Sequence, residues 1–211
     1  MAGRSALMET VRHAATPIGL DSGNGDVPKS LAPQFRYLRV QLNQGPPSLL
    51  VLGYLDPSPL GEVEVWYSAN SEVIKLQSGR VVATQGLGLD WPAVRFPLAP
   101  PAWHELGVSG AVFEREHDEL PSYRFGVRDR IVLEPVAFPL ALALPVSLSE
   151  PVARRYSWYV ERATQADGTV IQSWFALGRP GGLPAIVYSE QCLQPDYCLR
   201  MQRWPAQESD S

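Results

Sequence analysis

Apolar and polar side chains alternate along much of the chain from residue 35 onward. Leu38, Val40 and Leu42 alternate with Arg39 and Gln41, which is the period of a half-buried β-strand. The continuous apolar run 49–52 is typical of a strand that is covered on both faces. Further strand-like runs occur at residues 63–67, 73–76, 81–82, 123–127, 131–133, 156–162, 169–177 and 185–188.

Short glycine-containing turns separate these runs. Ser78-Gly79 and Asp167-Gly168 predict tight hairpins, since glycine accepts a positive φ without strain. Only residues 5–15 have the spacing of a short amphipathic helix. We therefore expect an all-β protein, an antiparallel β-sandwich or barrel with a short N-terminal helix. The expected organisation is an N-terminal helix and linker at 1–33, a single β-rich domain at 34–205 and a disordered tail at 206–211.

Composition and charge exclude several classes of protein. The chain has 211 residues, of which 45% are hydrophobic, and a net charge of −4. We expect no nucleic-acid partner, because Arg154-Arg155 is the only adjacent basic pair and phosphate binding needs a clustered basic surface. The apolar stretch 137–148 is shorter than the roughly 20 residues of a membrane span. Residues 1–15 lack the apolar segment of a signal peptide, so membrane association would need a lipid anchor that this sequence does not contain.

Motifs for cofactor or metal chemistry are incomplete. Gly86-Leu87-Gly88-Leu89 resembles the start of a dinucleotide-binding loop, but a third glycine and a following helix are lacking. His117 lies in an acidic run at residues 114–119, which is typical of a solvated loop, and a zinc site needs three or four convergent ligands. We therefore predict no cofactor, no metal site and no catalytic residues.

Tryptophan side chains suggest a surface that stacks on sugar rings. Trp66 and Trp158 lie in strand-like runs and are expected in the core. Trp91 and Trp103 lie in loop-like segments, where exposure is more plausible, although packing under a loop is the more common role.

The two cysteines, Cys192 and Cys198, lie six positions apart with Pro195-Asp196 as a turn between them. A disulfide closing this loop would stabilise the fold by about 2 kcal/mol. The alternative is a pair of reduced, inert thiols. An even count with an intervening turn favours the disulfide and therefore an oxidising compartment.

Several blocks of sequence, spread in order over residues 35–204, resemble one family. They are Arg36–Val40, Val63–Ser68, Ser78–Val82, Thr84–Leu87, Asp90-Trp91, Val187–Cys192, Tyr197-Cys198 and Gln202–Trp204. Their order and spacing are similar to those of the YjbF/GfcB family.

The resemblance implies a bacterial lipoprotein of exopolysaccharide or group 4 capsule gene clusters, with an all-β fold. Members carry a lipobox signal, are held in the periplasm at the outer membrane, and act as accessory components of polysaccharide production or export. The family supplies no catalytic residues to transfer. This sequence departs from it in having no lipobox cysteine before the β-rich region. An oxidising periplasm agrees with the disulfide inferred from the cysteine spacing.

Two functions follow as hypotheses. The first is a non-catalytic periplasmic module that binds other components of the export or biosynthesis system, or the polysaccharide itself, through Arg80, Asp90, Trp91 and Trp103. The alternative is a polysaccharide-modifying hydrolase or lyase. Such an enzyme needs two carboxylates about 5–10 Å apart across a sugar cleft, and its candidates are Asp90, Glu114, Glu116 and Asp118.

Overall fold

The described part of the chain forms one antiparallel sheet of twelve strands. The computed structural model describes residues 31–106, 109–140, 142–145 and 147–205. The strands are β1 (Tyr37–Leu42), β2 (Ser48–Asp56), β3 (Val63–Tyr67), β4 (Val73–Gln77), β5 (Arg80–Gln85), β6 (Val94–Arg95), β7 (Ala111–Glu119), β8 (Arg124–Val136), β9 (Ser157–Gln165), β10 (Val170–Gly178), β11 (Ala185–Gln194) and β12 (Tyr197–Trp204). Three short helical turns, η1 (Trp103–Glu105), α2 (Glu150–Ala153) and η2 (Pro180–Gly182), lie in the connections. The predicted all-β class is confirmed.

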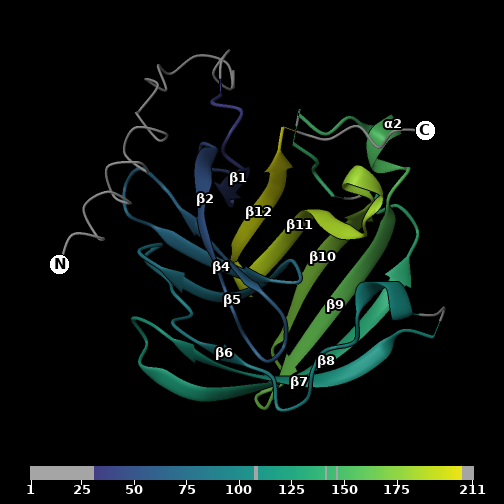
Figure 1. The fold of residues 1–211 in the computed structure, drawn as a ribbon. Helices are drawn as coiled ribbons and strands as arrows, with labels where there is room; N and C mark the ends of the chain where they lie inside the picture. Colours follow the sequence, from purple (N-terminus) through teal and green to yellow (C-terminus); the bar gives the residue numbers. More distant parts are fainter. Residues whose placement is uncertain (1–30, 107–108, 141, 146, 206–211) are drawn as a thin grey trace.

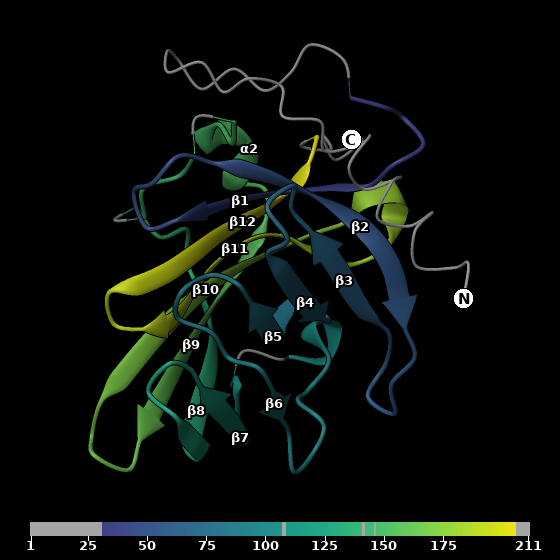
Figure 2. The ribbon, with the colours of Figure 1, turned by 90° about the vertical axis from the view of Figure 1, so that its left-hand side faces the viewer.

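The sheet is a meander whose first and last strands meet in its middle. The strands pair in the order β5-β4-β3-β2-β1-β12-β11-β10-β9-β8-β7-β6. Every pair except β1 with β12 also consists of neighbours in the chain. The sheet curls until its two edges, β5 and β6, approach one another, which gives the barrel-like shape seen in Figures 1 and 2. Of the two predicted architectures, the structure has the barrel.

Two sets of hydrogen bonds close the edge strand β5. Near its end, the Thr84 N–H donates to the Trp91 carbonyl at 2.7 Å, and the Trp91 N–H donates to Thr84 Oγ1 at 2.9 Å. Near its start, Gln191 of β11 accepts from the Val81 N–H at 2.9 Å and donates to the Gly79 carbonyl at 2.7 Å. Backbone groups at a sheet edge can otherwise pair with another chain, so these bonds remove part of an open edge.

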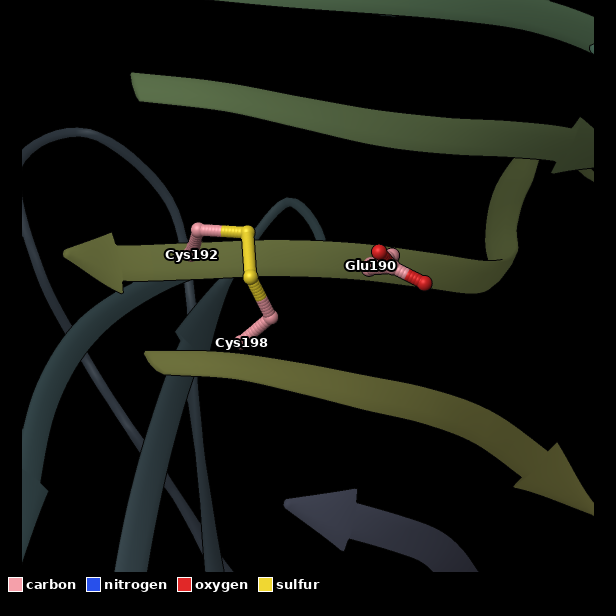
Figure 3. A group of neighbouring side chains, drawn as sticks. All are labelled: Glu190, Cys192 and Cys198. Carbon is pink, nitrogen blue, oxygen red and sulfur yellow. A yellow bond between two sulfur atoms is a disulfide. The ribbon is translucent and has the colours of Figure 1, made fainter. Parts of the chain in front are cut away.

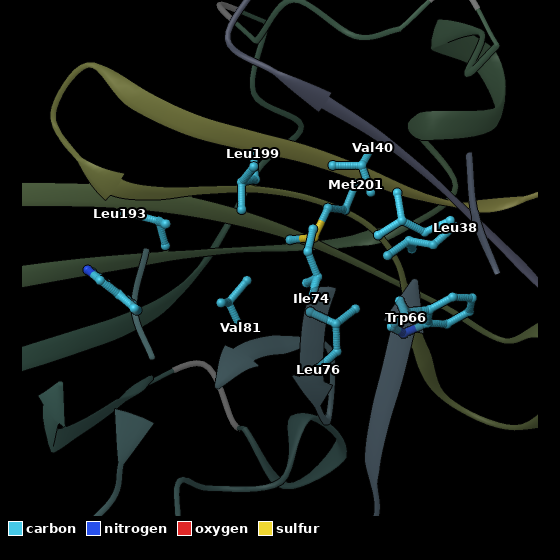
Figure 4. Packing of buried hydrophobic residues seen from close by; sticks show 11 residues of the cluster. Leu38, Val40, Trp66, Ile74, Leu76, Val81, Leu193, Leu199 and Met201 are labelled. Carbon is cyan, nitrogen blue, oxygen red and sulfur yellow. The ribbon is translucent and has the colours of Figure 1, made fainter. Parts of the chain in front are cut away.

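The inner surface of the curled sheet holds the hydrophobic core. One cluster, drawn in Figure 4, consists of Leu38, Val40, Leu50, Trp66, Ile74, Leu76, Val81, Trp91, Leu193, Leu199 and Met201. A second consists of Trp103, Phe113, Ile131, Leu133, Tyr159, Ala163, Ile171, Phe175, Ile186 and Cys192. The alternate positions Leu38 and Val40 belong to the first cluster, as their period predicts.

The outer face of the strands β9 to β11 is covered as well. Leu148 and Ala153, from the connection that contains α2, pack against Trp158, Ala176 and Tyr188. The Trp158 Nε1–H donates to the Ala153 carbonyl at 2.8 Å, which fixes α2 on β9. Trp66 and Trp158 are 0% and 3% exposed, so both tryptophans expected in the core are buried.

The turns agree with the sequence at two places and differ at a third. Ser78-Gly79, with φ of 50° and 81°, joins β4 to β5, and Gly168, with φ of 85°, lies between β9 and β10. The strand expected at 123–127 instead begins at Arg124, and Tyr123 lies before it with φ of 53°. Tyr123 and Phe125 are exposed, so the expected half-buried face is wrong at these positions.

The predicted N-terminal helix at residues 5–15 and the predicted tail at 206–211 lie outside the described residues. The sheet itself extends from Tyr37 to Trp204. Over the residues that the structure describes, no helix combines the length and the apolar character that a bilayer span requires.

Candidate functional site

Arg80 and Trp103, two of the predicted binding residues, meet inside the barrel. Arg80 opens β5, and its Nε donates to Glu161 Oε1 of β9 at 2.7 Å, with both side chains about 5% exposed. The Arg80 guanidinium lies 3.9 Å from the centroid of the Trp103 ring. The Trp103 Nε1–H donates to the Ser78 carbonyl at 2.7 Å. This group joins η1 to the β4–β5 turn and holds a buried charge between an anion and a ring face.

Asp90 organises the loop between β5 and β6. Its carboxylate accepts hydrogen bonds from Thr84 Oγ1 at 2.9 Å, the Gly86 N–H at 2.9 Å and the Leu87 N–H at 3.2 Å. A carboxylate that accepts three hydrogen bonds from nearby residues stabilises the loop in which it lies. The following residue, Trp91, is 1% exposed.

Trp91 and Trp103 are 1% and 6% exposed, so their packing beneath a loop is confirmed and the exposed alternative is wrong. Each ring packs in the core of the barrel. Both tryptophans come from segments without regular alternation, and such a sequence does not show which way its side chains point. A role of Arg80, Asp90, Trp91 or Trp103 in ligand binding stays a prediction.

A group of ionisable side chains, the interior charge cluster, lies at the β7–β8 side of the barrel. It comprises Arg115, His117, Glu119 and Asp129, and the exposed residue Arg124 reaches it from the barrel rim. His117 Nε2 lies 3.0 Å from Glu119 Oε1, and His117 Nδ1 lies 3.2 Å from Asp129 Oδ2. Arg115 Nη2 lies 2.6 Å from Asp129 Oδ2, and Arg124 Nη1 lies 3.3 Å from Glu119 Oε2. The expected solvated loop around His117 is thus wrong, because His117 is a fully buried strand residue.

Burial and charge act in opposite directions on Asp129. Burial by itself would raise the pKa of its carboxyl, but the hydrogen bond with His117 and the charge of Arg115 outweigh burial and lower that pKa. The His117 ring also lies 4.1 Å from the Trp91 ring, centroid to centroid. A histidine between two carboxylates has the composition of a general acid–base group. Here it is 0% exposed, and it joins β7, β8 and the Trp91 segment.

The spacing of His117 and Glu119 could have revealed the cluster. Residues two apart on a strand share a face, so a strand assignment at 111–119 would have placed both inside. Asp129 carried no such signal, because its pairing with His117 depends on the β7–β8 register.

The outer face of β7 carries three of the four acidic residues considered for catalysis, and the fourth is Asp90 of the β5–β6 loop. Glu114 is exposed. Arg95 of β6 lies 3.4 Å from Glu116 Oε1 and 2.7 Å from Asp118 Oδ2. Asp118 also accepts from the Gly126 N–H at 2.9 Å. The hydrogen bonds from Arg95 and Gly126 lower the pKa of Asp118, whereas a general acid for glycoside cleavage needs a raised pKa.

The predicted disulfide is present between Cys192 of β11 and Cys198 of β12. The two cysteines lie opposite each other in the β11–β12 register, and Glu190 lies beside them (Figure 3). One ligand atom from each of these three residues lies within 4.8 Å of the others. Metal binding by cysteine requires thiolates, which the intact disulfide does not provide. Glu190 is instead paired with Arg200 at 2.6 Å.

Tyr123 and Phe125, beside the turn between β7 and β8, form a surface feature that the sequence analysis missed. They are 73% and 67% exposed. The alternation at 123–127 predicts a half-buried strand. Tyr123 can be recognised as a bulky residue at a turn position only once the end of β7 and the start of β8 are known.

Two small pockets lie in the described structure. A pocket of about 20 Å³ is lined by residues that include Tyr156, Tyr188 and Arg203. A second, of about 10 Å³, lies beside Leu38 and Ile186. Each has room for about one water molecule, so neither accepts a sugar ring.

The fold and these sites define a barrel-like, all-β protein with a filled interior and a disulfide across its last hairpin. Residues 33–135 match the family described as "Group 4 capsule polysaccharide lipoprotein gfcB, YjbF". The match confirms the family that the blocks between Arg36 and Trp91 indicated, whereas the blocks at 187–204 lie outside the matched residues. The region from β1 to nearly the end of β8 is a YjbF/GfcB region.

A solved structure has a similar fold. The hypothetical lipoprotein YmcC from Escherichia coli (K12) is 16% identical to this chain, with a TM-score of 0.65. The similarity covers 84% of this chain and 86% of that one. At this identity it concerns the fold alone. No curated protein matches the chain.

Proposed function

We propose that this protein is a non-catalytic accessory module of exopolysaccharide or capsule production and export. It acts in the periplasm at the outer membrane and contacts a partner protein or the polysaccharide. The family supports the pathway, since it is the family of the group 4 capsule polysaccharide lipoprotein. The disulfide supports an oxidising compartment.

The observation that carries the non-catalytic part of the proposal is the use of acidic side chains as structural groups. Asp90 holds its own loop through three donors. Asp118 pairs with Arg95 on the outer face of the sheet. Asp129 and Glu119 are enclosed around His117. A glycosidase instead places two carboxyl groups on either side of an open sugar-binding cleft.

A pull-down from the native cell envelope tests this function. The immobilised, disulfide-intact protein is incubated with detergent-solubilised envelope from the source strain, with and without its polysaccharide. Capture of proteins encoded in the same polysaccharide cluster, or of the polymer, is expected. The same chain, denatured and reduced before immobilisation, is the control. Equal capture by the two samples would contradict the proposal.

The enzymatic alternative has its own test. The protein is incubated with the purified polysaccharide, and chain length is followed by size-exclusion chromatography. We expect no change in chain length. Shortening of the polymer, abolished by Asp118→Asn or Glu116→Gln, would replace the accessory role with hydrolase or lyase activity.

A further inference from the structure

The structure assigns a specific contact surface to the proposed function, on which this inference rests. We propose that Tyr123 and Phe125, called here the aromatic platform, stack on the sugar rings of the polysaccharide. The platform lies where β7 turns into β8 and is distinct from the buried residues Trp91 and Trp103.

The two rings are exposed and free of internal partners. Tyr123 is 73% and Phe125 is 67% exposed. Within the described structure, the aromatic pairs and the cation–ring contacts involve other residues, such as Trp103 with Phe175 and Arg115 with Trp91. Exposed aromatic surface is unfavourable in water, so two exposed rings at positions two apart in the sequence offer a surface that gains from a ligand.

The backbone of Tyr123 is the second observation. Its φ of 53° lies in the left-handed region, which is unfavourable for a residue with a bulky side chain. The other non-glycine residues with positive φ in the described chain are Asn43, Ser71 and Ser78, all small and polar. Tyrosine at such a position is not explained by turn chemistry, and the conformation presents its ring to solvent.

The platform has a rigid base. Arg124, between the two aromatic residues, lies 3.3 Å from Glu119 and 3.4 Å from Gln165. The Gly126 N–H is held by Asp118 at 2.9 Å. Leu120 forms paired backbone hydrogen bonds of 2.9 Å with Asp90. A site fixed before binding loses little conformational entropy when its ligand arrives. Asp90, one of the predicted binding residues, thus fixes the backbone three residues before Tyr123.

The surroundings favour a carbohydrate over a protein partner. The side chains of Arg124 and Arg128, both on β8, are 47% and 81% exposed. Glu116 of the neighbouring strand β7 pairs with Arg128. Sugars combine apolar C–H faces, which pack on rings, with hydroxyl groups, which bond to charged side chains. A stable protein interface buries about 800 Å² per partner around an apolar centre, whereas the aromatic platform is two rings within a charged surface.

Binding of the purified, size-fractionated exopolysaccharide of the source strain tests the platform. Affinity is measured by biolayer interferometry on immobilised protein, and circular dichroism verifies the fold. Tyr123→Ala/Phe125→Ala is expected to weaken binding about tenfold or more. The control Leu183→Ala removes an equally exposed apolar side chain, 74% exposed, from the β10–β11 connection and should keep wild-type affinity.

Two more variants separate stacking from folding. Tyr123→Gly relieves the left-handed backbone, so it should keep or raise the free energy of unfolding and still weaken binding. Tyr123→Leu/Phe125→Leu keeps apolar surface without flat rings and should also bind weakly, whereas Tyr123→Phe should bind as the wild type does. Wild-type affinity in Tyr123→Ala/Phe125→Ala would overturn the platform.

The outcomes also distinguish the platform from the proposed function. If the wild type captures envelope proteins but does not bind the polymer, the accessory function stands and the platform is wrong. If the platform variants lose envelope proteins and keep the polymer, the surface contacts a protein and the carbohydrate assignment is wrong.

Discussion

Gln191 on β11 holds the backbone of Val81 on β5, although the two strands lie far apart in the order of the sheet. Its amide accepts from Val81 at 2.9 Å and donates to Gly79 at 2.7 Å and to Ser189 at 2.9 Å. One side chain therefore binds the backbone at the start of the edge strand β5 from across the barrel, and this half of the closure depends on it.

Replacing Gln191 should open this contact. Gln191→Leu leaves the buried Val81 N–H and Gly79 carbonyl without partners and is expected to lower the free energy of unfolding by about 1–3 kcal/mol. Chemical denaturation measures the loss, and hydrogen exchange at the Val81 amide should accelerate. Gln172→Leu, on β10, is the matched control with an effect within about 0.5 kcal/mol. Equal losses in both variants would argue against the closure.

Arg80 and Glu161 form a buried ion pair at 2.7 Å. Arg80→Met leaves the buried Glu161 carboxylate without its partner and should lower the free energy of unfolding by about 3–5 kcal/mol. Glu161→Met leaves the buried Arg80 guanidinium unpaired and should have a similar effect. The double variant should lose less than the sum of the two single losses, because no unpaired charge remains. Strictly additive losses of unfolding free energy in this double-mutant cycle would show that Arg80 and Glu161 are not coupled.

The disulfide closes a loop with a sequence separation of six. Cys192→Ala/Cys198→Ala should lower the free energy of unfolding by about 2 kcal/mol, because the unfolded chain gains loop freedom. Denaturation of the wild type with a reducing agent should reproduce this loss, and the reductant should not affect the double variant. An unchanged midpoint on reduction would contradict the stabilising role.

Stability should fall in acid through Asp129. Its folded-state pKa is lowered from 3.8, so the unfolded chain binds the proton more tightly. The contribution is present above the unfolded-state pKa and is lost as the pH falls through the lower, folded-state pKa. Asp129→Asn should flatten the dependence of unfolding free energy on pH below about pH 5. An unchanged slope in Asp129→Asn would contradict this role of Asp129.

Local pattern was sufficient for much of the fold. The alternation at Leu38 and Val40 identified a strand with one core face, and Gly79 and Gly168 marked hairpins because few other residues accept their φ. The spacing of Cys192 and Cys198 with a turn between them predicted their bond. These features depend on residues close together in the chain.

The candidate sites were harder to predict. Trp91 and Trp103 lie in irregular segments, whose side-chain directions depend on what they pack against. His117 was placed in a loop because charged neighbours hid a strand in which charges face both sides. The alternation at Tyr123 and Phe125 predicts a half-buried strand for a different reason: the pattern continues past the rim of the barrel, where both faces of the strand meet solvent.

The sequence by itself determined the all-β class, the hairpin turns, the cysteine pair and the family, because each is written in short-range periodicity or in ordered blocks of residues. Only the tertiary structure decided that β1 pairs with β12, that Gln191 reaches β5, and that the charges around His117 are enclosed. Those relationships join residues far apart in the chain, and they exist only once the sheet has curled and brought its faces together.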